Sequence, residues 1–189
     1  MLGKLVSLRP LKVDDAEALW KEIGDDPDTW RWIGSGAPMP KNAEDLKTEF
    51  RRKVGRPDSE YFAILDSETG RVIGSTAFID IRDEDNHFEI GSTFIAPSFR
   101  GGNRNTEAKL LLLTEAFEVR KAVRVTLKAN ANNLRSRKAI EKIGAKFEGI
   151  LRNQRQERDG SWRNAAYHSV IVEEWPETKS RLEALLGAR

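Results

Sequence analysis

The spacing of apolar residues predicts short strands alternating with helices. Residues 5–9 (LVSLR) alternate between apolar and polar side chains, which is typical of a half-buried strand. Residues 14–23 instead carry apolar side chains at helical spacing, with Asp14 or Asp15 available as a cap and Pro27 expected to close the segment. Two tryptophans, two glycines and two prolines in residues 30–40 predict a loop, and residues 41–54 predict a charged helix.

Three strand-like runs joined by turns occupy the middle of the chain, at residues 61–65, 72–81 and 87–96. Such short links predict an antiparallel meander, which Pro97 ends because proline cannot donate to a strand ladder. The remaining pattern predicts a helix at 106–120, a strand at 123–129, a helix at 133–143 stopped by Gly144, a hairpin of 147–155 and 164–172, and a last helix at 178–186. The expected fold class is α+β, a single domain over residues 1–189 with helices packed on a mainly antiparallel sheet.

Composition narrows the possible functions. The 189 residues are 39% hydrophobic and 33% charged, as in a globular protein with a well-charged surface. Lys and Arg number 32 against 30 for Asp and Glu, so 32 − 30 = +2 leaves no strong field for coating DNA or RNA. The chain has no cysteine, which excludes disulfides and a thiol nucleophile, and no metal site is expected. No apolar run approaches a membrane span, so we expect a cytoplasmic protein without a membrane partner.

The stretch SFRGGNRNTEAKLLLL, residues 98–113, has the pattern of a basic turn that leads into a helix. Such a turn aims several backbone N–H groups at one spot, and the helix dipole adds roughly half a positive charge there. Glycine lets a phosphate approach the backbone, and asparagine tolerates left-handed angles. On local chemistry alone, a phosphate-binding turn and an ordinary turn with solvated arginines both stay open. The candidate residues are Arg100, Gly101, Gly102, Asn103, Arg104, Asn105 and Thr106.

A second motif, NANNLRSRKAIEKIGAKFEG, begins a helix with Asn133 and Ser136 on one face, three residues apart. Asparagine offers a donor and an acceptor, and serine offers a hydroxyl proton. Taken alone, the motif is explained as well by a helix cap and a surface serine.

Together the two motifs resemble the GNAT superfamily of acyl-CoA-dependent N-acetyltransferases, above all the branch of ribosomal-protein N-terminal (RimJ/RimL-type) acetyltransferases. The matching pieces follow the family's order along nearly the whole chain: LRPLKVDDAEALW, EIGSTFIAPSFRGG, NTEAKLLLLTEAFE, NLRS with IEKIGAKFEGILR, DGSWRNAAYHSV and EEW. The resemblance implies a central mixed sheet, splayed at its middle, with acetyl-CoA in the split as acyl donor. It also implies transfer of the acetyl group to a primary amine, such as a protein N-terminus or a small amine.

The resemblance assigns a role to each motif. The backbone of Phe94 and Ile95 would pair with the pantetheine arm, the turn from Arg100 to Thr106 would hold the pyrophosphate, Asn133 would bind the pantetheine, and Ser136 would stand near the sulfur. The turn departs from the family pattern Arg/Gln-x-x-Gly-x-Gly/Ala, because Asn103 and Asn105 occupy the two later small positions.

Amine attack on a thioester needs a base, a polarised carbonyl and a leaving thiolate. Glu89 is the candidate base, on a strand whose alternation puts Glu89, Gly91 and Thr93 on one face, and Ser136 is the candidate acid. A surface glutamate paired with a basic residue is the alternative for Glu89. The absence of an evident strong base suits an α-amino group, whose reference pKa is near 7.7–8.0, better than a lysine near 10.4.

Aromatic residues are the candidate acceptor contacts. Trp30 and Trp32 fall where this family shapes its acceptor site, and Tyr167, with Trp162, is placed to form the opposite wall. Packing in the core is an equally good explanation for each of them. His87 and His168 are expected to be structural or exposed rather than catalytic.

Two other functions stay open. A GNAT-fold protein that binds acyl-CoA without transfer is one, since the turn is altered. A ribosome- or RNA-contacting module is the other, suggested by a basic cluster that glutamates interrupt: Arg135, Arg137, Lys138, Lys142, Lys146, Arg152, Arg155 and Arg158. A homodimer is also possible.

Overall fold

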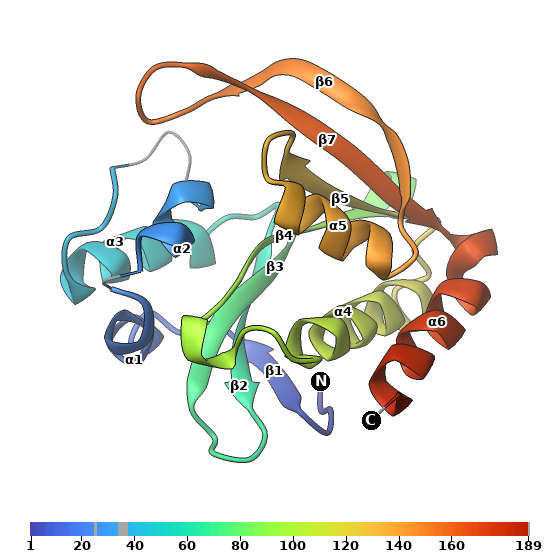
Figure 1. The fold of residues 1–189 in the computed structure, drawn as a ribbon, viewed down its shortest axis with the longest axis horizontal. Helices are drawn as coiled ribbons and strands as arrows, with labels where there is room; N and C mark the ends of the chain where they lie inside the picture. Colours follow the sequence, from blue (N-terminus) through green and yellow to red (C-terminus); the bar gives the residue numbers. More distant parts are fainter. Residues whose placement is uncertain (25, 34–37, 189) are drawn as a thin grey trace.

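The computed structural model describes residues 1–24, 26–33 and 38–188. Their strands form one sheet of seven, in the order β1-β2-β3-β4-β5-β7-β6, with helices packed against it (Figure 1). This confirms the expected α+β fold class. The strands are β1 (Val6–Pro10), β2 (Glu60–Asp66), β3 (Val72–Arg82), β4 (His87–Ile95), β5 (Arg124–Asn130), β6 (Lys146–Gln156) and β7 (Trp162–Ile171).

The helices of the described residues are α1 (Asp15–Ile23), α2 (Pro27–Trp32), α3 (Ala43–Val54), α4 (Arg104–Thr114), α5 (Leu134–Lys142) and α6 (Trp175–Gly187). A π-helical turn, Glu115–Val119, continues α4, so the expected helix at 106–120 changes its hydrogen bonding after Thr114. Gly144 ends the α5 region with φ of 103°, the left-handed conformation expected there. No described helix has the length and apolar character needed to cross a membrane.

The sheet is splayed in its middle. Neighbouring strands are antiparallel except β4 and β5, which run parallel. Their pairing ends at Ile90–Leu127, although β4 continues along β3 to Ile95 and β5 continues along β7 to Asn130. One edge of β4 is therefore left without a strand partner after Ile90, which gives the split that the resemblance implies.

A bulge in β4 lies at the beginning of this split. Ala77 pairs with Gly91 and Ser75 with Phe94, so β4 has one residue more than β3, and Ser92 takes φ of 50°. The bulge reverses the faces of the residues after it, and the expectation that Thr93 shares a face with Glu89 and Gly91 is therefore wrong.

Two hydrophobic clusters cover the two faces of the sheet. In β2, Phe62 and Ile64 pack into a cluster with α4 and α6, whereas Ala63 packs into another with α1 and α3. In β4, Ile90 and Ile95 share the α4 cluster despite their odd spacing, because the bulge lies between them.

The sequence-based prediction starts the loop at residue 30, whereas α2 continues to Trp32 in the structure. Trp30 and Trp32 belong to α2, a helix that the sequence-based prediction missed and whose first residue is Pro27. Asp26 is the N-cap and accepts a hydrogen bond from the Thr29 N–H at 2.9 Å, and proline is well tolerated in the first helical turn. Residues 34–37 of the expected loop lie outside the described residues.

Candidate active site

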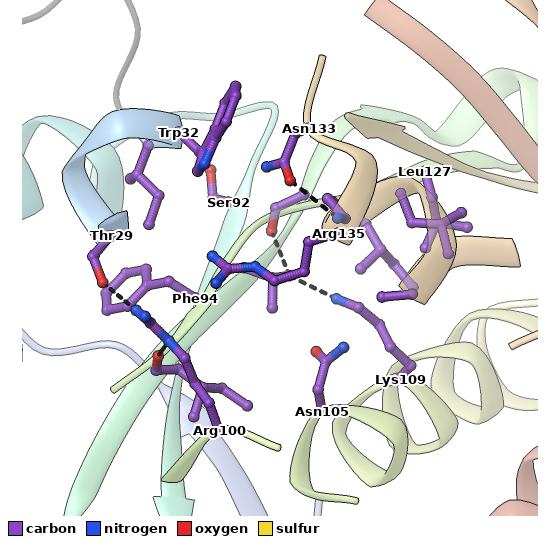
Figure 2. A pocket seen from close by; sticks show the side chains of 18 of the residues that line it. Thr29, Trp32, Ser92, Phe94, Arg100, Asn105, Lys109, Leu127, Asn133 and Arg135 are labelled. Carbon is purple, nitrogen blue, oxygen red and sulfur yellow. Dashed lines mark hydrogen bonds between the residues drawn. The ribbon is translucent and has the colours of Figure 1, made fainter. Parts of the chain in front are cut away.

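A cavity of about 330 Å³ occupies the split between β4 and β5. Its walls come from β4 and β5, from the turn before α4, and from α2, α4 and α5; Figure 2 shows their side chains converging on it. The candidate residues that line it are Trp32, Phe94, Ile95, Arg100, Gly101, Gly102, Asn105, Asn133 and Ser136. Residues from distant parts of the chain thus meet at the point where the sheet opens.

The turn before α4 has the backbone geometry of an anion site. Gly101 takes φ of 82°, which favours glycine, and nothing lies within 4 Å of the place of a Cβ there. Asn103 is the N-cap of α4 but makes no side-chain capping bond. Backbone N–H groups of the first helical turn therefore remain available to a ligand from the cavity side.

The two arginines of the turn are engaged elsewhere. Arg100 lies 2.7 Å from Asp26, bonds Thr29 and donates from Nε to the Ile95 carbonyl at 2.8 Å, so it points towards α2 in Figure 2. Arg104 pairs with the buried Asp66 at 2.8 Å. Burial alone would raise the pKa of each carboxyl, but the hydrogen bonds from threonine and arginine hold both pKa values below their usual range. The arginines therefore fix the turn, and their charges are largely neutralised.

The two asparagines of the turn differ in their surroundings. Asn103 donates from Nδ2 to the Leu185 carbonyl of α6 at 2.8 Å, away from the cavity. Asn105 lines the cavity, and its Oδ1 is buried without a hydrogen-bond partner among the described residues. A buried acceptor without a hydrogen bond costs free energy unless a ligand donates to it. The Asn105 Oδ1 could therefore accept a hydrogen bond from a ligand group such as an amide N–H. Thr106, also buried, is absent from the described cavity lining.

The start of α5 forms the opposite wall. Asn133 is its N-cap and accepts a hydrogen bond from the Ser136 N–H at 3.0 Å, which leaves the Asn133 amide N–H₂ and the Ser136 hydroxyl for other partners. Arg135 also lines the cavity and lies 3.7 Å from Asp28 of α2. Both members of the second motif are thus brought to one cavity wall.

Glu89 lies just before the split, where it is buried and 2.5 Å from Lys128 Nζ. Burial raises the pKa of Glu89, while Lys128 acts in the opposite direction. Lys128 itself lines the cavity and its Nζ lies 5.1 Å from the centre of the Tyr167 ring. Glu89 therefore has access to the cavity only through its neighbours, and Tyr167 contacts the same lysine.

The two candidate tryptophans separate. Trp30 is buried, its ring centre lies 6.0 Å from that of Trp20, and it donates its indole N–H to the Ile23 and Gly24 carbonyls, so it packs in the core under α2. Trp32 lines the cavity with the Arg31 guanidinium 4.8 Å from its ring centre. Trp162 is exposed on β7.

The sequence-based prediction missed Lys109. This residue of α4 lines the cavity, is buried, and donates from Nζ to the Thr93 hydroxyl at 2.6 Å. Burial lowers its pKa to about 7. The signal lay in the helical spacing, because Leu112 and Leu113 follow at three and four residues and are fully buried, which puts Lys109 on the inner face.

The histidines have structural surroundings. His87 Nε2 lies 2.8 Å from the Thr126 hydroxyl, and burial lowers its pKa. His168 is fully buried beside Phe147 and Glu141. Neither of them is in the described cavity lining.

Comparison with known proteins agrees with this geometry. Residues 6–146 match the family model described as an acetyltransferase (GNAT) domain. The chain is 26% identical to the probable N-acetyltransferase YjcK of Bacillus subtilis (strain 168), over 90% of this chain and 94% of that protein. It is 38% identical to the "putative acetyltransferase" from T. thermophilus, whose crystal structure covers 98% of this chain and 95% of its own, with a TM-score of 0.89.

The fold is also that of RimJ from Mycobacterium smegmatis, solved with CoA-disulfide: 23% identity, 95% and 88% coverage, and a TM-score of 0.79. Since the family model spans most of the chain, the chain belongs to the GNAT family of acetyltransferases and is an N-acetyltransferase.

Proposed function

We propose that this N-acetyltransferase takes the acetyl group from acetyl-CoA and transfers it to a primary amine, with a protein N-terminal α-amino group as acceptor. The observation that carries the proposal is the free edge of β4 after Ile90–Leu127, which lies in a cavity whose other end is the start of α4. An extended amide-bearing arm can pair with such an edge, and a diphosphate suits a helix N-terminus.

The residues at the donor end fit CoA chemistry. The uncapped first turn of α4 and Gly101 present backbone N–H groups, and the orphaned Oδ1 of Asn105 offers an acceptor to an amide N–H. Phe94 and Ile95 would supply the strand edge and Asn133 the amide contact across the cavity. Because Arg100 and Arg104 are paired with aspartates, the proposed diphosphate binding depends on backbone N–H groups and the helix dipole more than on arginine charge.

The reaction follows from the residues around the split. The neutral acceptor amine attacks the thioester carbonyl, whose oxygen a backbone N–H at the Ser92 bulge would polarise. The Ser136 hydroxyl would protonate the departing thiolate, directly or through water. Glu89 would take the amine's proton through water or through its neighbour Lys128, and its raised pKa makes it a stronger base than an exposed carboxylate.

The acceptor assignment rests on acidity. A lysine needs about 3–4 kcal/mol more than an α-amino group to lose its proton at neutral pH, and Glu89 is already engaged by Lys128. Trp32 and Asp28 from α2 line the cavity and would contact the acceptor chain. Trp30, packed in the core, has no part in this site, and Tyr167 would act through Lys128. A homodimer and a cytoplasmic location stay predictions.

Mass spectrometry of products tests the proposal. The protein is incubated with acetyl-CoA and with peptides that differ in their first residue, each also supplied with a blocked α-amine and a free lysine, and with polyamines. We expect acetylation at the α-nitrogen of free peptides. Acetylation of lysine or polyamine alone would contradict the acceptor, and binding of acetyl-CoA without any acetylated product would contradict the transfer.

A further inference from the structure

One cation of the cavity differs from the others in its partners. Arg100, Lys128 and Arg135 each have a carboxylate within 4 Å, from Asp26, Glu89 and Asp28 respectively. Lys109 lines the same cavity. Among the described residues it donates a hydrogen bond to the Thr93 hydroxyl and has no carboxylate within 4 Å. A buried ammonium without a counter-charge is costly, so it either loses its proton readily or is stabilised by an anion that binds or develops beside it.

The position of Lys109 indicates which anion. It is the sixth residue of α4, about 7.5 Å along the axis from Arg104 at 1.5 Å per residue, and so lies beyond the first turn where a diphosphate would bind. Its side chain ends on Thr93, which also bonds Thr76 at 2.8 Å and the Gly91 carbonyl at 3.3 Å. Figure 2 shows Lys109 reaching from α4 towards β4, into the space that α5 faces across the split.

We propose that the Lys109 ammonium stabilises the negative charge that develops on the thioester carbonyl oxygen during acetyl transfer, and that Thr93 holds the ammonium at the β4 bulge. This rests on the proposed function, which puts the thioester at the same bulge. As the amine nitrogen forms its bond to the carbonyl carbon, the C=O π pair moves onto oxygen beside Lys109. When the carbonyl re-forms, the C–S bond breaks and the thiolate leaves, so Lys109 neither gains nor loses an atom. A preorganised donor of this kind acts most strongly where bound substrate excludes water.

The charge state of Lys109 connects this role to pH. Desolvation lowers its pKa to about 7, so the ammonium is lost as pH rises through that value in the free protein. The other charged side chains that line the cavity come from α2, the turn before α4, β5 and α5: Asp28, Arg100, Lys128 and Arg135. Two carboxylates outside the lining pair with them, Asp26 with Arg100 and Glu89 with Lys128. Each of these six has an opposite charge within 4 Å in the described structure, so we expect Lys109 to dominate titration near neutral pH.

The test compares Lys109→Met, which keeps length without charge, with Lys109→Arg, which keeps the charge at every accessible pH. Thr93→Val removes the anchor, and Lys138→Met on the exposed face of α5 is the matched control. For each variant we would measure kcat and KM from pH 6 to 9, acetyl-CoA affinity by calorimetry, and thermal unfolding. NMR of labelled lysine, assigned through Lys109→Met, follows the Lys109 titration in the free protein.

We expect Lys109→Met to lower kcat by about 10²–10³-fold, the usual cost of one oxyanion donor, with little change in acetyl-CoA affinity. The fall of kcat/KM at alkaline pH should vanish in Lys109→Met and move to higher pH in Lys109→Arg. Thr93→Val should lower kcat in part, and Lys138→Met should leave kcat unchanged. Parent-like kcat in a folded Lys109→Met, or an acetyl group found on Lys109 itself, would overturn the inference, whereas an NMR titration of Lys109 near pH 7 would support the alkaline fall predicted for the parent. A parent that binds acetyl-CoA but transfers nothing refutes the proposed function as well, whereas an active parent with an equally active Lys109→Met refutes this inference alone.

Discussion

The guanidinium of Arg100 lies 2.7 Å from the carboxylate of Asp26, and this ion pair joins the turn before α4 to the N-cap of α2. Arg100 also donates to the Ile95 carbonyl at the end of β4. One side chain thus holds together three elements that border the cavity. The residue whose charge suggested phosphate binding is, in the structure, the part that fixes the turn.

The first prediction concerns this pair. If Arg100 acts through Asp26, Arg100→Ala and Asp26→Ala should each lower thermal stability and acetyl-CoA affinity, and the double variant should lose much less than the sum, because the two act as one unit. Calorimetric titration and thermal unfolding of the three proteins provide the coupling. A large affinity loss in Arg100→Ala with none in Asp26→Ala would show that Arg100 binds the phosphates directly.

The second prediction concerns Gly102, which lines the cavity beside the start of α4. Gly102→Glu adds bulk and a negative charge where the phosphates would bind, so we expect acetyl-CoA affinity to fall steeply. Gly55→Glu, at the exposed end of α3 where a Cβ meets only the Arg51 carbonyl at 3.7 Å, is the control and should bind like the parent. Equal acetyl-CoA affinity of Gly102→Glu and the parent would mean that the diphosphate binds elsewhere.

The third prediction separates Asn133 from Ser136. Ser136→Ala should lower kcat towards the 10²–10⁴-fold typical of lost general-acid assistance while acetyl-CoA affinity stays nearly unchanged. Asn133→Ala should chiefly weaken acetyl-CoA binding, with about 1 kcal/mol lost from the α5 cap that it forms with the Ser136 N–H. Steady-state kinetics with calorimetry distinguish the two. Parent-like turnover of Ser136→Ala would leave the thiolate to another proton donor.

The fourth prediction concerns stability and pH. The Lys109 pKa is about 7 when folded and near 10.4 when unfolded, so between these values the unfolded chain holds the extra proton. Stability of the parent should therefore rise with pH over this window relative to Lys109→Met, by up to about 1.4 kcal/mol per pH unit. Below pH 7 both states are protonated, the burial penalty is complete, and the variant should be the more stable. Urea unfolding of both proteins at pH 6, 7.5 and 9 measures the difference; a constant difference would mean that Lys109 titrates normally.

Local patterns were enough to predict most elements of this fold. The strand alternation, the helical spacing and Gly144 are local signals, and each has its counterpart in the structure. The pattern did not predict α2, because a proline that follows one helix can also begin the next, and the capping bond of Asp26 shows that Pro27 does so. The bulge at Ser92 could not be predicted from the sequence, since it depends on the register between β4 and β3. It determines which β4 side chains after it lie on the α4 face of the sheet.

The sequence predicted which segments form the candidate site, but not which of its charged side chains are paired. Asn133, Ser136 and part of the turn before α4, Arg100 to Gly102 with Asn105, line one cavity. The sequence could not show that Asp26 and Asp66, which lie 74 and 38 residues away from their arginine partners, would neutralise Arg100 and Arg104. For the same reason, the one cavity lysine without a carboxylate among the described residues, Lys109, went unnoticed. Ion pairing over long sequence separations is a property of the tertiary fold.

The central claim is that an amine attacks acetyl-CoA in the split between β4 and β5. A single-turnover experiment tests it most directly: the protein is mixed with acetyl-CoA carrying a labelled acetyl group and with an excess of a peptide whose α-amine is free. We predict that the label appears on the peptide's α-nitrogen, that free CoA thiol forms in equal amount, and that Gly102→Glu abolishes both under the same conditions. Labelled thioester that stays intact while bound, or peptide labelled equally well by Gly102→Glu, would contradict the account.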